Sequence, residues 1–306
     1  MSRSPDRTEA IALGATLYLP GTRQHLAPIA LGRRYKLRSA VICLEDSIRR
    51  DEAPAAMRNV AALLGALPGD GSRPMLFIRP RDPAMLEALL RLDGIERIDG
   101  FVLPKATADS LPDYLACPLH AHHRLMPTLE TREMFDPAEV RRLRDQLLAV
   151  RPRVLALRIG GNDLLRLLGA RRSSVRTLYE GPLAATVAGL AAAFAPHGFA
   201  LSAPVFEHFA GDALLREEVE RDIEHGLVTK TVIHPRQIAV VEAAYAVARE
   251  ELAEAKAILA PDGPAVFALA GSMCEPATHR PWALTIVRRA EIFGIRREPE
   301  TIAAVL

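Results

Sequence analysis

Acidic side chains follow two short apolar runs of the sequence at positions where they could bind a metal ion. Glu130 comes directly after the run 125–129, and Asp163 follows the run 154–159. If the runs are neighbouring parallel strands, their ends lie about 5 Å apart, so both carboxylates can share one cation. Carboxylates without cysteine or paired histidine nearby suit Mg2+ or Mn2+ rather than zinc. The structural alternative is that Glu130 caps a turn and Asp163 caps a helix starting at Leu164.

A basic residue after another run is suited to hold an anion. Arg79 directly follows the run 75–78, and its planar guanidinium fits a carboxylate or the charge of an enolate. The alternative on local evidence is a salt bridge with Glu45 or Asp46, the acidic pair at the end of the run 40–44. Both interpretations place Arg79 at the mouth of the same fold.

Other polar residues follow the remaining runs, and each has an ordinary structural alternative. Lys105 suits a phosphate or a carboxylate, although an exposed lysine at a turn needs no explanation. His234 is either a general base or, as the safer interpretation, a turn histidine. Arg23 follows the first run. The set as a whole, rather than any one residue, therefore indicates a site.

Three clusters give weaker signals. The histidines within 120–123 precede a run, which places them at the opposite end of the fold from the candidate site, so we expect surface histidines rather than metal ligands. The basic stretches 33–38 and 171–176 have the charge to hold the nucleotide part of coenzyme A, but solvated helix faces are the favoured interpretation.

Eight apolar runs define the elements that must position these side chains. They are continuous rather than alternating, as expected for strands buried on both faces, and each interval is long enough for a crossover helix. The sequence therefore predicts an α/β fold, a (β/α)8 TIM barrel with a C-terminal helical extension. The alternative is an open doubly wound sheet, which is disfavoured because no G-x-G-x-x-G turn follows the first run. The runs are 16–19, 40–44, 75–78, 101–103, 125–129, 154–159, 200–203 and 231–233.

Helical signals fill the intervals. Asp136 precedes Pro137 and Glu139, as in a capping box, and the amphipathic segment 212–225 stops at Gly226. We assign residues 1–260 to the barrel and 261–306 to the extension. The other predicted helices are 54–67, 183–195, 237–259 and 282–293.

Composition excludes several classes of partner. Lys and Arg number 39 against 37 Asp and Glu, a formal net charge of +2, so no overall attraction toward nucleic acid or an anionic membrane is visible. Three scattered cysteines argue against a disulfide framework. The N-terminus lacks the apolar core of a signal peptide, and the apolar segment 183–195 is too short to cross a bilayer. We expect a cytoplasmic protein with a small-molecule partner, no nucleic acid and no membrane.

Seven short motifs in this order resemble those of the citrate lyase β-subunit-like and HpcH/HpaI aldolase superfamily. The resemblance runs from about Thr16 to Ile292 and covers most of the chain. The matching segments are 19–23, 43–47, 78–79, 102–105, 129–131, 159–164 and 233–237.

The resemblance implies a lyase that binds Mg2+, with Mn2+ as an alternative, through Glu130 and Asp163. Arg79 would hold an oxo-acid, and Glu45 and Asp46 would organise metal-bound waters. Members break or form a carbon-carbon bond in hydroxyacyl-coenzyme A thioesters or 4-hydroxy-2-oxo acids. We therefore expect release of a small oxo-acid from one of these substrate classes.

Further expectations follow from the same resemblance. Arg23, Lys105 and His234 are expected to contact the substrate. Members commonly form trimers or hexamers, in which a C-terminal segment can cover a neighbour's site. A homo-oligomer is accordingly expected, with the 261–306 extension on a neighbouring subunit.

Two departures from the family pattern keep other functions open. Asn162 stands where the family usually has glutamate, and Arg81 where it usually has asparagine. A non-catalytic barrel acting as a ligand-binding or scaffold subunit is the main alternative. Phosphoryl transfer is a second, disfavoured because no Walker A signature is present. For the general base, Glu45, Asp46, His234 and a neighbour's Glu275 are all open.

Overall fold

The computed structural model describes residues 9–69 and 72–296. The chain divides into two units, Met1–Val241 and Glu242–Leu306. The division lies earlier than residue 260, because α10 (Arg249–Ile258) belongs to the second unit. There its buried side chains pack with those of α11 (Pro276–Phe293) in one apolar cluster.

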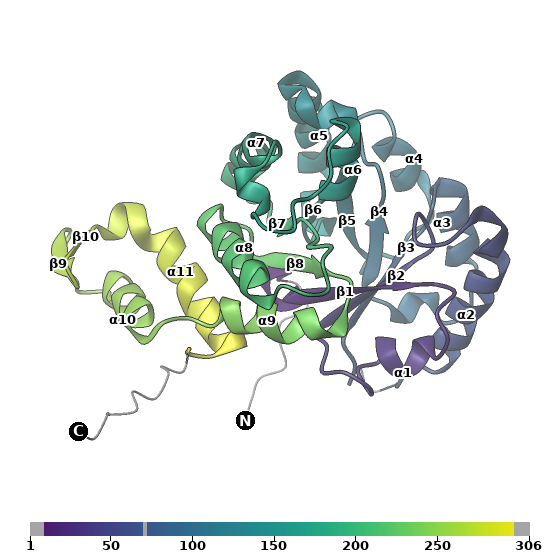
Figure 1. Cartoon of the computed structure of the whole chain (residues 1–306), viewed down its shortest axis with the longest axis horizontal. Helices are drawn as coiled ribbons and strands as arrows, with labels where there is room; N and C mark the ends of the chain where they lie inside the picture. The colour runs from purple at the N-terminus through teal and green to yellow at the C-terminus, as the bar shows by residue number, and fades with distance from the viewer. Residues whose placement is uncertain (1–8, 70–71, 297–306) are drawn as a thin grey trace. The chain divides into compact units, whose positions relative to one another are not determined.

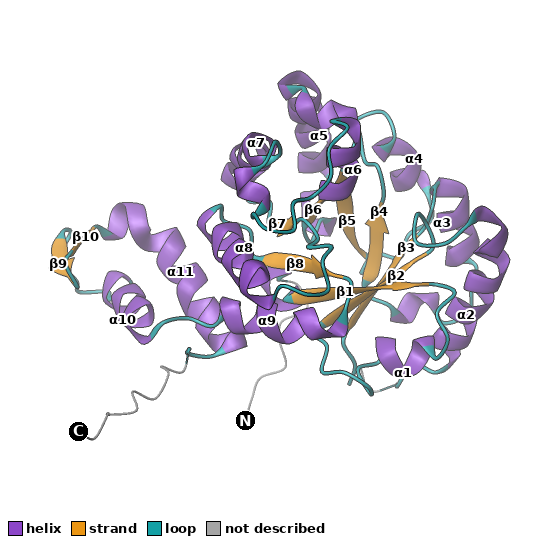
Figure 2. Cartoon of the chain, in the orientation of Figure 1, coloured by secondary structure: helices purple, strands orange, loops and turns teal. Residues whose placement is uncertain are grey.

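The first unit contains a closed barrel of eight strands in sequential order, with every neighbouring pair parallel. Figures 1 and 2 show these strands inside and the helices outside. This confirms the predicted (β/α)8 TIM barrel. The strands are β1 (Ala15–Pro20), β2 (Ser39–Cys43), β3 (Met75–Arg79), β4 (Gly100–Leu103), β5 (Arg124–Leu129), β6 (Leu157–Ile159), β7 (Leu201–Ala203) and β8 (Thr229–Val232).

The helices of the first unit follow the predicted segments closely. Asp136 caps α5 by accepting a hydrogen bond from the Ala138 N–H at 2.8 Å. Glu139 does not complete the predicted capping box, because its carboxylate bonds Arg142 instead. The helices are α1 (Leu26–Ala30), α2 (Ala53–Gly65), α3 (Pro83–Leu90), α4 (Leu111–Ala116), α5 (Pro137–Ala149), α6 (Gly161–Leu167), α7 (Ala184–Phe194) and α8 (Asp212–Glu224), followed by α9 (Pro235–Tyr245) at the division.

Two strands differ from the predicted runs by more than one residue at an end. β6 begins at Leu157, and Val154 makes only an isolated bridge with Leu125. β8 begins two residues before the predicted run, at Thr229. A hydropathy pattern misses this start because Lys230 is charged, yet its side chain is fully buried against two carboxylates of α8.

The single predicted helix 237–259 is two helices, α9 and α10. The break is at 246–248, where the Val247 N–H bonds the Gly294 carbonyl at 3.1 Å. The Ala248 N–H bonds the Glu251 side chain at 3.1 Å, which starts α10. A tertiary contact with the residues after α11 therefore interrupts a sequence that is locally helical.

A small hairpin in the second unit was not predicted. β9 (Phe267–Leu269) and β10 (Ser272–Cys274) pair antiparallel. Ala270 and Gly271 connect them with positive φ angles of 51° and 83°, as a tight two-residue turn requires. Alanine is a poor signal for such a turn, which explains the omission.

None of the helices in the described part of the chain has the length and apolar character needed to cross a lipid bilayer. Cys43, Cys117 and Cys274 are buried free thiols.

Candidate active site

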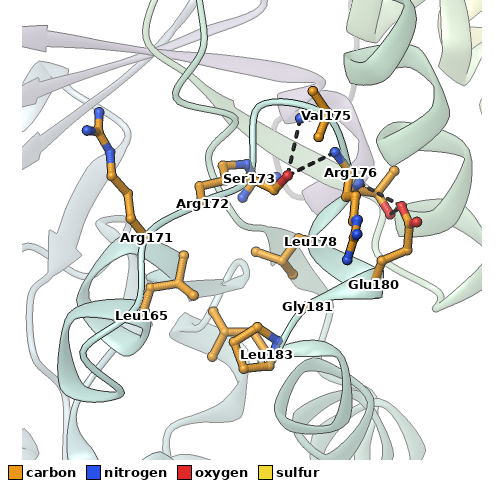
Figure 3. A pocket seen from close by; sticks show the side chains of 12 residues that line it. Leu165, Arg171, Arg172, Ser173, Val175, Arg176, Leu178, Glu180, Gly181 and Leu183 are labelled. Atoms are coloured by element: carbon orange, nitrogen blue, oxygen red, sulfur yellow. Dashed lines mark hydrogen bonds between the residues drawn. The ribbon is translucent and has the colours of Figure 1, made fainter.

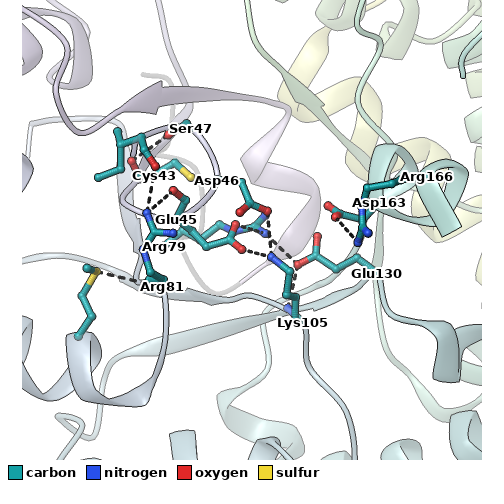
Figure 4. Close-up of polar contacts among 12 residues, drawn as sticks. Cys43, Glu45, Asp46, Ser47, Arg79, Arg81, Lys105, Glu130, Asp163 and Arg166 are labelled. Atoms are coloured by element: carbon teal, nitrogen blue, oxygen red, sulfur yellow. Dashed lines mark hydrogen bonds and ion pairs between the residues drawn. The ribbon is translucent and has the colours of Figure 1, made fainter. Parts of the chain in front are cut away.

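A cavity of about 280 Å³ opens at the C-terminal ends of the barrel strands. Figure 4 shows the polar side chains that gather there. Glu130 follows β5 and Asp163 lies in the first turn of α6, directly after β6. These two strands pair in parallel, with Leu129 opposite Ile159. Closure of the barrel thus brings both predicted metal ligands to one cavity. The lining also includes Tyr18, Glu45, Asp46, Arg79, Thr128, Arg158, Asn162 and Thr231.

Arg79 lies between two carboxylates. Its Nη2 is 2.7 Å from Glu45 Oε2 and 2.8 Å from Glu130 Oε1, and all three side chains are buried. Burial disfavours the charge, but Glu130, Tyr18 and Glu45 outweigh it and raise the pKa of Arg79. Arg79 therefore makes the predicted salt bridge with Glu45 and also lines the cavity.

Lys105 connects the acidic residues at the cavity mouth. Its Nζ pairs with Glu45 and lies 2.9 Å from Asp46 Oδ2, while its backbone N–H donates to Glu130 Oε1 at 2.8 Å. Lys105 has a φ of 49°, a left-handed conformation that is uncommon for a residue with a side chain. Burial opposes the charge of Asp46, but the Lys105 ammonium and a hydrogen bond to Glu45 hold the pKa of Asp46 below its ordinary value.

The electrostatic environment of Glu130 is unlike that of an exposed carboxylate. Burial raises its pKa to about 7; the Arg79 charge opposes this rise and the Asp163 charge adds to it. Asp163 is steadied by Arg166, at 3.4 Å between Oδ1 and Nη2. Gly160 gives Glu130 its room, since a Cβ there would lie 2.4 Å from both Glu130 Cβ and Oε2.

All three predicted substrate residues, Arg23, Lys105 and His234, are absent from the cavity lining, although Lys105 contacts Glu45, Asp46 and Glu130 of that lining. Arg23 is exposed. The His234 ring lies 5.4 Å from that of Phe209, and its Nδ1 accepts from the Arg236 N–H, the geometry of the turn histidine favoured above. Arg81 donates to the backbone carbonyls of Glu45 and Ile48 at 2.9 and 3.0 Å. It thereby supports the segment that carries the acidic pair.

Sequence reasoning missed the lower part of the cavity. The predicted site residues follow the runs, whereas Thr128, Arg158 and Thr231 lie within the strands themselves. The available signal was the arginine inside the otherwise apolar run 154–159. A charged residue in a buried strand is rare unless it is paired or functional.

The expectation of surface histidines at 120–123 is wrong for His123, whose side chain is fully buried. Its Nε2 lies 3.1 Å from the Ile95 carbonyl oxygen, and its ring meets the Phe101 ring edge-on. Burial is the main cause that lowers the pKa of His123, to about 4.

A larger cavity, about 400 Å³, lies on the segment after α6 (Figure 3). Arg171, Arg172 and Arg176 line it together with leucines such as Leu178. The predicted solvated helix face is wrong here, because this segment is a loop and Arg172 is buried. Arg172 pairs with Glu218, and its guanidinium lies 5.2 Å from the Phe206 ring centre.

Behind that loop is a buried charge network that sequence reasoning did not find. Lys230 Nζ lies 3.0 Å from Glu218 Oε1 and 2.8 Å from Asp222 Oδ2. The Tyr179 hydroxyl donates to Asp222 at 2.6 Å, and the Leu178 N–H donates to Glu218 at 2.9 Å. The network joins β8, α8 and the loop.

Comparison with known proteins gives concordant results. A family model described as C-C bond lyase of the TIM-barrel fold matches residues 7–295. The L-malyl-CoA/beta-methylmalyl-CoA lyase of Rhodobacter capsulatus is 26% identical over 274 residues, 81% of this chain and 86% of its own. The (3S)-malyl-CoA thioesterase of Cereibacter sphaeroides is 25% identical over 238 residues, 78% and 79% of the two chains.

Solved structures share the fold. A citrate lyase from Burkholderia xenovorans LB400 superposes with a TM-score of 0.71 at 19% identity, over 94% of both chains. The protein CitE from Mycobacterium tuberculosis, solved with magnesium, acetoacetate and coenzyme A, gives a TM-score of 0.68 at 24% identity, over 92% of this chain and 99% of its own.

Proposed function

This chain belongs to the C-C bond lyases of the TIM-barrel fold, and from that premise we propose that it is a Mg2+-dependent lyase of a hydroxyacyl-coenzyme A thioester or a hydroxy-oxo-acid. The reaction is a retro-aldol or retro-Claisen cleavage that releases a small oxo-acid. One observation carries the proposal: Glu130 and Asp163, from neighbouring strands, line one cavity together with Arg79.

The donor set fits magnesium. Glu130 Oε1 accepts from Arg79 and from the Lys105 N–H, which leaves Oε2 for a ligand. In the described residues no three His, Cys, Asp or Glu side chains form a metal cluster, but Mg2+ is commonly held by one or two carboxylates, with water and substrate completing its shell. Glu130 and Asp163 would hold the ion, which would supply a Lewis acid for the oxo-acid.

Arg79 supplies fixed positive charge at the reacting end. Its two carboxylate neighbours, Glu45 and Glu130, hold the guanidinium in place before substrate arrives. Cleavage of a carbon-carbon bond next to a carbonyl leaves an enolate, whose oxygen carries the new negative charge. A preorganised cation at that oxygen contributes roughly 3–4 kcal/mol of transition-state stabilisation.

Lys105 holds the two acidic residues at the mouth in position. It pairs with Glu45 and Asp46 at once. Asp46 is the more exposed of the two carboxylates, at 60% of its side chain against 3% for Glu45. It is therefore the better placed of this pair to exchange a proton with substrate or water.

The substrate class is inferred from the named relatives. The malyl-CoA enzymes act on thioesters of hydroxy acids, and the CitE structure contains magnesium and coenzyme A. We extend this to a coenzyme A thioester as substrate here. From the family resemblance we also propose a homo-oligomer, a trimer or hexamer, in which the 261–306 extension packs on a neighbouring subunit.

The test is release of an oxo-acid by the purified protein from malyl-CoA, citryl-CoA and a 4-hydroxy-2-oxo acid, with the product trapped by phenylhydrazine. We expect turnover of at least one substrate with MgCl2 and loss of at least 99% of it in excess EDTA. Asp163→Ala should behave like the EDTA sample.

Asp145→Ala is the matched control, because Asp145 lies on the exposed side of α5 and pairs only locally with Arg144 among the contacts described. It should retain wild-type turnover. Equal turnover with Mg2+ and in EDTA, or an active Asp163→Ala enzyme, would contradict the metal role.

A further inference from the structure

The floor of the active-site cavity contains a second arginine. Arg158 projects from β6 into the barrel, is 2% exposed, and lines the same cavity as Arg79. Its Nη2 donates to Thr231 Oγ1 at 2.6 Å, and its guanidinium lies 5.2 Å from the Tyr18 ring centre. These contacts with β8 and β1 hold the cation across the barrel interior.

A hydroxyl group stands next to this arginine. Thr128 pairs in register with Arg158 across β5 and β6, so both side chains point to the same face of the sheet, the barrel interior. Thr128 is 2% exposed and lines the cavity. Its Oγ1 makes no hydrogen bond with any group in the described residues. Buried hydroxyls without a partner are rare in folded proteins, and Thr128 belongs to the cavity lining, where a ligand or a water can supply the partner.

The negative and positive side chains lie at different depths of the cavity. The carboxylates Glu45, Asp46, Glu130 and Asp163 follow the strands and occupy its mouth, whereas Thr128 and Arg158 lie within the strands. Tyr18, which stacks on Arg158, lines the same cavity; burial raises its pKa, while Arg158 and Arg79 both act to lower it. The floor is therefore a donor-rich corner with positive charge, suited to a carboxylate.

We propose that Arg158 and Thr128 form a second anion subsite, which binds the far carboxylate of a dicarboxylic oxo-acid whose oxo-carboxylate end lies at Arg79. The inference rests on the proposed function and narrows it. Of the oxo-acids a lyase can release, this enzyme selects one with a second carboxylate, as oxaloacetate has, over one with a short alkyl end.

The test compares two acids that differ at one group. Oxaloacetate carries a carboxylate where 2-oxobutanoate carries a methyl group. Their affinities are measured by isothermal titration calorimetry at saturating MgCl2, on wild type, Arg158→Met and Thr128→Val. We expect wild type to prefer oxaloacetate at least tenfold. Arg158→Met should lose at least tenfold in oxaloacetate affinity and less than threefold in 2-oxobutanoate affinity.

Thr128→Val keeps the shape of the side chain and should cost oxaloacetate about threefold to tenfold, in line with the loss of one hydrogen bond. If Arg158→Met does not fold, the loss of oxaloacetate affinity in Thr128→Val tests the second subsite instead. Arg151→Met is the matched control: Arg151 also stacks on an aromatic ring, Phe199 at 4.9 Å, but lies at the start of the segment leading to β6 and outside the cavity lining. It should leave both affinities unchanged.

The outcomes separate the two proposals. If wild type binds both acids equally, or if Arg158→Met and Thr128→Val weaken both acids alike, the second subsite is refuted while the lyase proposal stands. If wild type binds neither acid with Mg2+, the proposed function fails and the subsite fails with it.

Discussion

Acidification should destabilise the protein through one buried histidine, His123. Its side chain has no exposed surface, and burial lowers its pKa to about 4, with smaller contributions from His122, His120 and Arg153. In the unfolded chain the same imidazole has a pKa of about 6.5. Between pH 6.5 and 4 the unfolded state therefore binds a proton that the folded state does not, and stability falls as the pH falls through this window.

The magnitude follows from the two pKa values. Linkage between pH 7 and pH 5 gives a loss of about 2 kcal/mol from this single residue. The neighbouring His122 is exposed, so solvent screens part of its electrostatic effect on His123. We therefore expect the free energy of unfolding to fall by about 1–2 kcal/mol between pH 7 and pH 5. That is a substantial part of the 5–15 kcal/mol that typically separates folded from unfolded domains.

The assay is urea unfolding at pH 7 and pH 5 for wild type and His123→Gln. Glutamine cannot titrate, and its amide can still donate to the Ile95 carbonyl that lies 3.1 Å from His123 Nε2. Other groups contribute to the pH dependence of both proteins, so the quantity of interest is the difference between them. Wild type should lose about 1–2 kcal/mol more than the variant, and His122→Gln serves as the control for removal of an exposed neighbouring histidine.

The reasoning is refuted if wild type and His123→Gln lose the same free energy of unfolding between pH 7 and pH 5. That result would mean that His123 takes up its proton equally well in the folded chain. The packing against Phe101 would then be looser than the ring geometry indicates.

Two further predictions concern the barrel. Lys230→Met removes the ammonium that pairs with Glu218 and Asp222 and should lower the free energy of unfolding by about 3–5 kcal/mol; urea unfolding measures it, and a loss under 1 kcal/mol would contradict the buried network. Gly160→Ala places a Cβ 2.4 Å from Glu130 Oε2 and should reduce kcat/KM about 100-fold through displacement of that carboxylate. Gly189→Ala, where nothing lies within 4 Å, should retain activity; equal kcat/KM in both variants would sink the argument.

The strand order of the barrel was predictable because its signals are local. A strand covered on both faces needs a continuous apolar run, and a parallel neighbour needs a long connection. Each segment contains these features locally; the run 75–78, for example, is continuously apolar and corresponds to β3. These local signals fail where a buried side chain is charged and paired rather than apolar. This is why the start of β8 at Thr229, next to the buried Lys230, was missed.

The break between α9 and α10 could not be predicted from local sequence. Residues 246–248 lie in a sequence that favours helix, yet the Val247 N–H bonds Gly294, far along the chain. Local propensity amounts to less than about 1 kcal/mol for each ordinary residue, so a tertiary contact overrides it. No pattern within the segment records that contact.

By itself the sequence determined the barrel and the order in which acidic and basic groups follow its strands, since both depend on short apolar runs and on the polar residues directly after them. Tertiary structure decided which of those groups meet. Barrel closure and register put Arg79 between Glu45 and Glu130, and the same register turned Arg158 and Thr128 into the cavity. Side-chain partners across a closed sheet depend on the stagger of strands far apart in the chain, and that stagger is a property of the whole fold.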